Sequence, residues 1–305
     1  MVRDERAQLL LVAAITVAVF IVSFSVVFNG VIFTEQRTGG DADIAASGAE
    51  QFSYEVRETT ANLLVRVNHA TVYGGGGLPD AHDAARTNIQ SNYGPILASS
   101  YGASSPVAVN VTYDETNSTL GSRVVQRSDG GSTTSANVAG RAVGWFTLNV
   151  NASETDGFTV SVENQTETVT YDIERNSHGP GLNVTVSGDV SQPAVTCEQT
   201  GDRVLIDLVA GTAFGDDCEF PSFRDELVGP YDVTFEDEND ASLRYELVVN
   251  GTGTGVSAPD CTGASGRDVP CRSDAVWVAH VETQYDRARV SYQDTQNVSV
   301  YGGGV

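Results

Sequence analysis

The chain begins with a long apolar run, because residues 7–34 include no charged side chain. Residues 9–28 alone would span about 30 Å of hydrocarbon at helical rise. A buried helix of a soluble protein is rarely apolar on every side for so long. A cleavable signal would be shorter and followed by a small-x-small site, whereas residues 29–33 read Asn-Gly-Val-Ile-Phe. We therefore expect residues 8–34 to form one transmembrane helix.

The arginines that flank this run predict its orientation. Arg3 and Arg6 lie on the short N-terminal side, whereas Arg37 alone precedes Asp41 on the other side. Arginine favours the cytoplasmic flank, and acidic residues contribute little to this rule. The sequence predicts a single-pass protein of the cell membrane, with residues 1–7 in the cytoplasm and everything after the helix outside the cell.

The charge of the chain is strongly negative, with a formal value of −23, and all 17 basic residues are Arg. Such a surface repels nucleic acid, so we expect no nucleic-acid partner. In molar salt the screening length falls to about 3 Å, and the self-repulsion of the surface largely disappears. The Lys-free, acidic composition resembles that of proteins from extremely halophilic archaea.

Acceptor sequons for N-glycosylation are frequent beyond the apolar run. Seven Asn-x-Ser/Thr sequences occur there, against about three expected by chance, which favours glycosylation of an exported chain. The alternative is that Thr-rich strands create such sequences by accident. The sequons begin at Asn110, Asn117, Asn151, Asn164, Asn183, Asn250 and Asn297.

All four cysteines also lie beyond the apolar run, which fits disulfide bonds in an oxidising environment. Sequential pairing would join Cys197 to Cys218 and Cys261 to Cys271, and two other connectivities remain open. A zinc site is the alternative, but no Cys-x-x-Cys occurs and the four histidines are scattered.

Hydrophobic periodicity divides the exported part into two regions. Residues 35–105 are predicted to be helical: 41–69 carry an apolar face, and a second helix begins at Pro79-Asp80 and is interrupted by Gly94-Pro95. Residues 106–305 alternate Val, Thr, Tyr and Phe with polar residues. The expected fold class is α+β, in which a transmembrane and an amphipathic helix precede a large antiparallel β domain of pilin-like or β-sandwich type.

This order, an apolar helix, an amphipathic helix and then β-sheet, resembles that of type IV pilins. The junction Arg6-Ala7-Gln8 resembles the cleavage site of archaeal prepilins, which implies a cut after Ala7. The junction has Ala7 where Gly is usual, and Val12 stands at the fifth position after it, where Glu is usual. The wider stretch 6–35 is similar to an uncharacterised family of haloarchaeal single-pass membrane proteins that resemble archaeal pilins.

Motifs for catalysis are missing from the sequence, which has no nucleophile elbow, P-loop, HExxH or dinucleotide fingerprint. His82 between Asp80 and Asp83 is interpreted as part of a helix start, with acid–base or metal chemistry as the alternative. Gly74 to Gly77 are interpreted as a linker. The acidic residues Glu236, Asp237, Glu238 and Asp240 are interpreted as a solvated hairpin turn, with a Ca²⁺ or Mg²⁺ site as the alternative.

The functional expectation is a binding protein of the cell surface, not an enzyme, with no cofactor. It would be a pilin-like subunit or envelope component with protein partners in the envelope or in a pilus-like filament. The alternative is an unprocessed single-pass receptor or an envelope-stabilising glycoprotein. A third class, an anchored hydrolase, would require Asp and His groups that converge in a deep pocket.

Overall fold

The computed structural model describes the chain from residue 41 onward, with gaps. The described residues are 41–70, 80–104, 106–129, 138–177, 181–191, 196–214, 218–237, 241–253, 255–256, 258–261, 270–288 and 290–302. The predicted transmembrane helix and the Arg6-Ala7-Gln8 junction lie outside them. Within these ranges, none of the helices combines the length and the apolar character needed to cross a membrane.

A long helix opens the described part, as the sequence predicted. Helix α2 (Asp41–Ala70) buries Ala49, Phe52 and Val56 at three- and four-residue steps, which places them on one face. Leu64 and Thr60 are also fully buried there, so the face is wider than the apolar pattern suggested. The other helices are α3 (Ala81–Arg86), the π-helix η1 (Thr87–Tyr93), α4 (Gly94–Ser104) and the short α5 (Phe223–Glu226).

Gly94-Pro95 does not interrupt the second helix, so that prediction was wrong. The chain passes from α3 through η1 into α4 without a break. In η1 the widened turn lets the Gly94 N–H donate to Ile89 O, five residues earlier, and Pro95 falls in the first turn of α4, where its missing N–H costs little.

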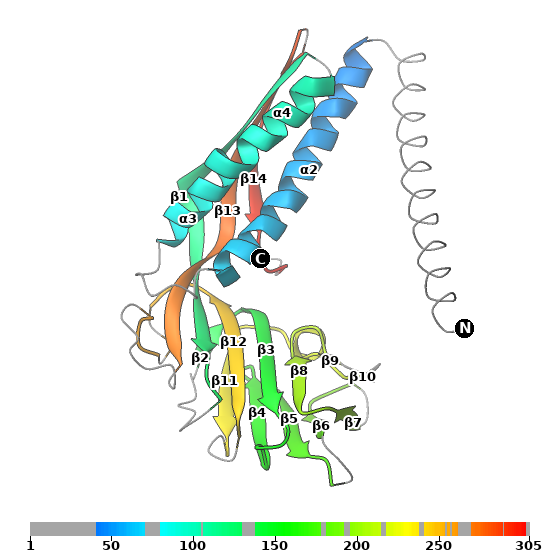
Figure 1. Ribbon diagram of the computed structural model, residues 1–305, viewed down its shortest axis with the longest axis vertical. Helices are drawn as coiled ribbons and strands as arrows, with labels where there is room; N and C mark the ends of the chain where they lie inside the picture. Colours follow the sequence, from blue (N-terminus) through cyan, green and yellow to red (C-terminus); the bar gives the residue numbers. More distant parts are fainter. Residues whose placement is uncertain are drawn as a thin grey trace, which may run out of the picture.

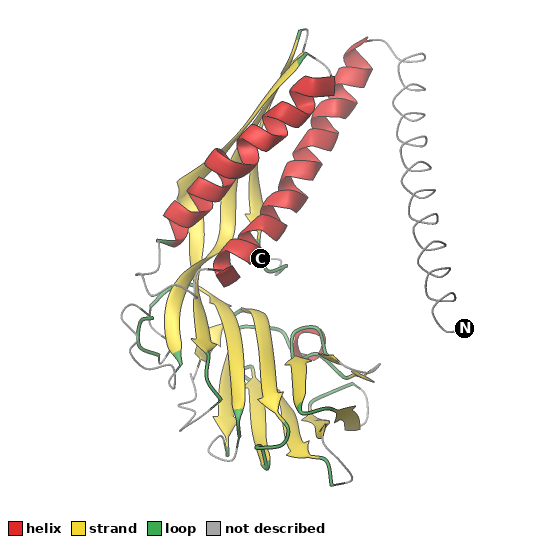
Figure 2. Ribbon diagram, viewed as in Figure 1, coloured by secondary structure: helices red, strands yellow, loops and turns green. Residues whose placement is uncertain are grey.

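Fourteen strands among the described residues form two antiparallel sheets, and the β-rich α+β class is confirmed (Figure 2). One sheet has the order β10-β9-β8-β3-β12-β1-β13-β14, and the other β2-β11-β4-β5-β6-β7. The strands are β1 (Val107–Gln126), β2 (Val138–Arg141), β3 (Val143–Asn151), β4 (Gly157–Glu163), β5 (Thr168–Arg175), β6 (Gly181–Gly188), β7 (Thr196–Thr200), β8 (Arg203–Asp207), β9 (Thr212–Phe214), β10 (Cys218–Glu219), β11 (Tyr231–Glu236), β12 (Leu243–Asn250), β13 (Cys271–Arg287) and β14 (Val290–Ser299).

The two sheets enclose a common core in one half of the molecule. Alternate residues of β3, β4, β5, β6 and β11 point into it, as period-two patterning predicts. Phe235 of β11 lies between the sheets, with ring centroids 5.9 Å from Phe146 of β3 and 5.2 Å from Tyr245 of β12. This half is therefore a β sandwich.

Strands β1 and β13 continue beyond the sandwich and carry the other half of the molecule, here called the extension (Figure 1). There β1, β13 and β14 form a three-stranded sheet, and α2 and the α3–η1–α4 helix lie along one of its faces. The helices and these strands share one apolar core, which includes Phe52, Val111 and Tyr285. The secondary structure changes near residue 105, but the helices do not pack separately from the sheet.

Candidate functional site

The face of the extension sheet that is turned away from the helices is polar along its length. Side chains alternate along each strand, so Val111 and Tyr113 point to the helices while their neighbours point outward. The register aligns these outward residues in three cross-strand rows. The rows, called the polar face below, are Asn110–Gln284–Gln293, Thr112–Glu282–Thr295 and Asp114–His280–Asn297.

The row of Asp114 is ordered by hydrogen bonds beside an irregularity in β1. The register shifts between Asp114 and Thr119, so residues 115–118 protrude from the ladder. The Asn117 side-chain amide donates to Asp114 Oδ2 at 2.6 Å, and this bond lowers the pKa of the Asp114 carboxyl. His280 Nδ1 lies 2.8 Å from Asn297 Oδ1 in the same row. A shallow hollow of about 400 Å³ lies over the other two rows.

Three of the seven predicted sequons begin on or beside the polar face. Asn110, Asn117 and Asn297 are exposed, and Thr112 and Ser299 lie on the same side of the sheet as the Asn that each follows. Asn151, Asn164, Asn183 and Asn250 are partly buried. Accessibility therefore ranks Asn110, Asn117 and Asn297 first, while glycosylation of every sequon stays a prediction.

The partly buried sequons include asparagines whose side chains hold local structure. The Asn250 side-chain oxygen accepts from the Ala142 N–H at 2.8 Å. The Asn164 side chain accepts from the N–H groups of Thr166 and Glu167 in the turn between β4 and β5. A glycan on Asn164 Nδ2 would leave a single N–H for the two acceptors that this nitrogen now serves, Glu167 Oε2 and Val228 O, both at 3.3 Å.

The second of the two sequential disulfides is present. Cys261 and Cys271 are joined by an S–S bond of 2.04 Å, and Cys271 begins β13. The bond lies beside Val125 of β1, which packs with both cysteines. Cys218 is buried in β10, whereas the Cys197 side chain lies outside the described part, so its pairing with Cys218 stays a prediction.

The acidic residues after β11 do not form a hairpin turn, and that interpretation was wrong. Glu236 ends β11 in one sheet, whereas the next strand, β12, belongs to the other sheet. The connection therefore crosses between sheets. Asp237 is exposed and left-handed, with φ 57°, a conformation that Asp tolerates. Glu238 and Asp240 lie outside the described residues, as do Gly74 to Gly77.

His82 belongs to a helix start, as the sequence analysis interpreted it. Asp80 is the N-cap of α3, and its carboxylate accepts from the N–H groups of His82 and Asp83 at 2.9 and 3.2 Å. The His82 ring lies 2.7 Å from the Tyr113 hydroxyl. In the described ranges, no three His, Cys, Asp or Glu side chains gather in a metal-binding group.

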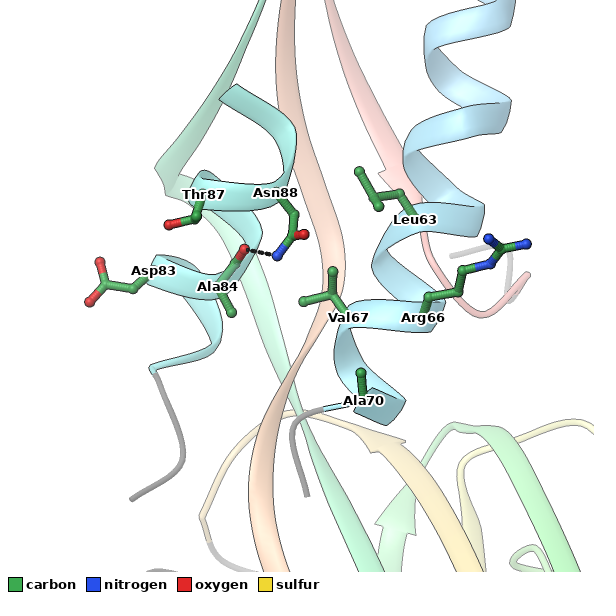
Figure 3. A pocket seen from close by; sticks show the side chains of 8 residues that line it. All are labelled: Leu63, Arg66, Val67, Ala70, Asp83, Ala84, Thr87 and Asn88. Atoms are coloured by element: carbon green, nitrogen blue, oxygen red, sulfur yellow. Dashed lines mark hydrogen bonds between the residues drawn. The ribbon is translucent and has the colours of Figure 1, made fainter. Parts of the chain in front are cut away.

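A cleft of about 450 Å³ lies between α2 and the α3–η1 helix (Figure 3). Leu63, Val67 and Ala84 give it an apolar lining, and the Asn88 amide donates to Ala84 O at 2.9 Å. The charged groups of Arg66 and Asp83 point away from the space between the helices (Figure 3). The labelled side chains do not converge as a catalytic group would, and we assign the cleft no ligand.

A partly buried polar cluster joins α2 to the sheet at the point where the extension meets the sandwich. The Glu246 carboxylate of β12 binds Arg123 Nε of β1 and lies 2.6 Å from His69 Nδ1 in the last turn of α2. The Arg123 side chain is only 3% exposed. Arg123 Nη2 also donates to His69 O at 3.4 Å. These three residues, called the junction cluster, link two strands to the helix end.

Neighbouring groups complete this link. Asn68 is buried, and its side chain exchanges two 2.9 Å hydrogen bonds with the backbone of Val276 in β13 and donates to the Tyr301 hydroxyl. The His69 ring packs against Trp145 of β3 with ring centroids 4.6 Å apart. The end of α2 is therefore attached to β1, β3, β12, β13 and the C-terminal segment.

Electrostatics within the junction cluster favour the charged form of Glu246. Burial alone would raise the pKa of this carboxyl, but the hydrogen bonds from His69 and Arg123 outweigh it and hold the pKa below its ordinary value of 4.5. Two buried nitrogens of the cluster, His69 Nε2 and Arg123 Nη1, have no hydrogen-bond partner among the described atoms. The charge-assisted bonds to Glu246 compensate for the burial of Arg123.

No family model, curated protein or solved structure matches this chain.

The junction cluster was not predicted from the sequence. There His69 is one of four scattered histidines, and neither Arg123 nor Glu246 belongs to a recognisable motif. The available signal was one basic residue in a buried strand, Ser122-Arg123-Val124-Val125, and one acidic residue inside Tyr245-Glu246-Leu247. Charges at such positions are rarely buried unless they are paired.

Proposed function

We propose that the chain is a membrane-anchored protein of the cell surface whose β-rich part works through protein–protein or surface contacts. Its finer assignment is a pilin-like subunit or envelope component. The supporting observation is the position of the α2 N-terminus, at the end of the extension that is farthest from the β sandwich (Figure 1). A membrane helix at residues 8–34 would enter the molecule at that end, and the sandwich would project away from the membrane.

Further observations support a location outside the cell. The Cys261–Cys271 disulfide is typical of an oxidising environment, and the exposed sequons Asn110, Asn117 and Asn297 lie together on the extension. Helix α2 has 30 residues and is about 45 Å long at helical rise. It would hold the sandwich at a distance from the membrane, where a partner or surface can reach it.

The N-terminal mass of the native protein tests the pilin-like assignment. We expect a chain that begins at Gln8, recovered in surface appendages that shear from the cells. A control variant with Arg6 replaced by Leu should keep its original N-terminus, because the basic residue before the cut is lost. A native chain that still begins before Gln8 and stays with the membranes would remove the pilin-like assignment and favour the anchored receptor or envelope glycoprotein.

A further inference from the structure

Strand β14 is the longest edge strand among the described strands. It pairs with β13 over ten residues with no register shift, and no other described strand lies on its far side. The other sheet edges among the described strands, β10, β2 and β7, have two, four and five residues. An edge strand offers unpaired N–H and C=O groups to another chain.

The usual protections of an edge are weak in β14. The strand contains no Pro, Lys or Arg. Its single acidic residue, Asp294, is turned toward α2, where it accepts a hydrogen bond from the Ser53 hydroxyl at 2.9 Å. Strand β14 is thus able to pair with a further strand. Its ladder with β13 indicates which of its backbone N–H and C=O groups would form the new hydrogen bonds.

The outward backbone groups belong to the odd-numbered residues. The Val300 N–H donates to Trp277 O at 3.0 Å, which continues the β13–β14 ladder. Because pairing alternates along an antiparallel ladder, the even-numbered residues of β14 face β13. The N–H and C=O groups of Gln293, Thr295 and Asn297 therefore point away from β13.

A charged stripe on α2 runs beside the centre of this edge. Ser53 bonds to Asp294, and Gln296 donates to Ser53 O, which places Ser53 beside Thr295. Glu50, Tyr54 and Arg57 are exposed and line a hollow of about 400 Å³ together with residues of β14. Along the axis of α2, Glu50 lies before the level of Thr295 and Arg57 lies after it. The two side chains carry opposite charges.

We propose that β14 pairs with β14 of a second copy of this chain, antiparallel, about a twofold axis that passes through Thr295 perpendicular to the sheet. In this register Asp294 lies opposite Gln296 of the other copy, so no two carboxylates face each other, and Tyr292 lies opposite Val298, a favourable aromatic–β-branched pair. A twofold axis at Asp294 would instead place two carboxylates opposite each other.

The same axis matches the charges of the two α2 helices. It makes them antiparallel, so Glu50 of each copy approaches Arg57 of the other, and the two Tyr54 rings lie nearest the axis. Tyr54 is 68% exposed in the single chain, so its ring is accessible to the other copy. The interface is isologous and closes as a dimer. Because the α2 helices are antiparallel, their N-termini lie at opposite ends of the dimer, so two copies anchored as proposed above would pair from facing membranes.

Oxidative cross-linking of the full-length chain in mild detergent, where no membrane constrains the orientation of the copies, tests this dimer. In the Thr295→Cys variant the two engineered thiols lie across the axis, where paired Cα atoms are about 5.5 Å apart, a distance that a disulfide spans. The matched control is Gln293→Cys, on the same strand and face. It lies two residues from the axis, so its symmetry mates are roughly 14 Å apart. We expect at least tenfold more covalent dimer for Thr295→Cys than for Gln293→Cys or the parent chain.

Equal cross-linking at both positions, or none at Thr295, would overturn the proposal. The charge pairs give a second test in the Thr295→Cys background. Adding Arg57→Glu should reduce the cross-linked dimer severalfold, and adding Glu50→Arg to that variant should restore it. Failure of the double charge reversal to restore the dimer would contradict the proposed approach of the two helices.

Discussion

Replacing Glu246 by Ala is expected to lower the free energy of unfolding by about 3–5 kcal/mol, because it leaves a buried guanidinium without its carboxylate. The Arg123 side chain is only 3% exposed, and its Nη1 already lacks a partner among the described atoms. Urea unfolding of the chain in a mild detergent would measure the loss. The control is Glu282→Ala, an exposed carboxylate on the polar face, which should change the value by less than about 0.5 kcal/mol.

Removing both charges of the Arg123–Glu246 pair should lower the free energy of unfolding less than removing the carboxylate alone. The double variant Arg123→Met/Glu246→Leu takes away the buried cation together with its partner, so we expect it to be more stable than Glu246→Ala. If Glu246→Ala were as stable as the parent chain, the junction cluster would not hold α2 to the sheet.

The lowered pKa of Glu246 also predicts part of the pH dependence of stability. A carboxyl whose pKa is lower in the folded than in the unfolded chain stabilises the fold above its unfolded pKa, and this contribution is lost as the pH falls through the folded pKa. The loss should therefore begin below pH 4.5, the ordinary value for Glu. A Glu246→Gln variant should lack this component, whereas the contribution of the other carboxylates stays the same. If the stability of the parent chain and that of the Glu246→Gln variant changed identically with pH, the predicted contribution of Glu246 would be contradicted.

Replacing Phe52 by Ala is expected to cost about 3–5 kcal/mol, the range for a buried aromatic residue. Phe52 is fully buried where three elements meet, with ring centroids 5.3 Å from Tyr101 of α4 and 5.7 Å from Tyr285 of β13. The cavity would weaken the contact between both helices and the sheet.

The matched control for Phe52 is Gln51→Ala, the neighbouring exposed position on α2. Alanine is a good helix former, so this variant should keep the stability of the parent chain within about 0.5 kcal/mol. Amide hydrogen exchange of α2 in the Phe52→Ala variant should be faster than in the control. Equal exchange and equal stability would mean that the α2 face does not hold the helix layer in place.

Local patterns in the sequence were enough to predict most individual elements. Alternating Val and Thr residues predicted strands such as β4, β5 and β6, and the apolar steps of residues 49, 52 and 56 predicted the buried face of α2. These signals are local, since each strand or helix shows its own period regardless of its neighbours.

The features that depend on pairing between distant segments could not be predicted. Strand β1 continues through residues 115–121, where Thr, Asn, Ser and Gly suggest a turn, because β13 supplies a partner on both sides of the irregularity. The junction cluster joins residues 69, 123 and 246, and no local pattern relates them. Gly94-Pro95 reads as a helix break, and only the π-turn before it lets the helix continue.

The most direct test of the anchored, outward-facing arrangement is protease treatment of intact native cells, followed by analysis of washed membranes and supernatant. We predict that peptides from residues 41–302 are released into the supernatant, whereas a fragment that contains residues 8–34 stays in the membranes. Release of these peptides only after the cells are lysed would contradict the outward-facing arrangement. Recovery of the intact chain in the soluble fraction would contradict the membrane anchor.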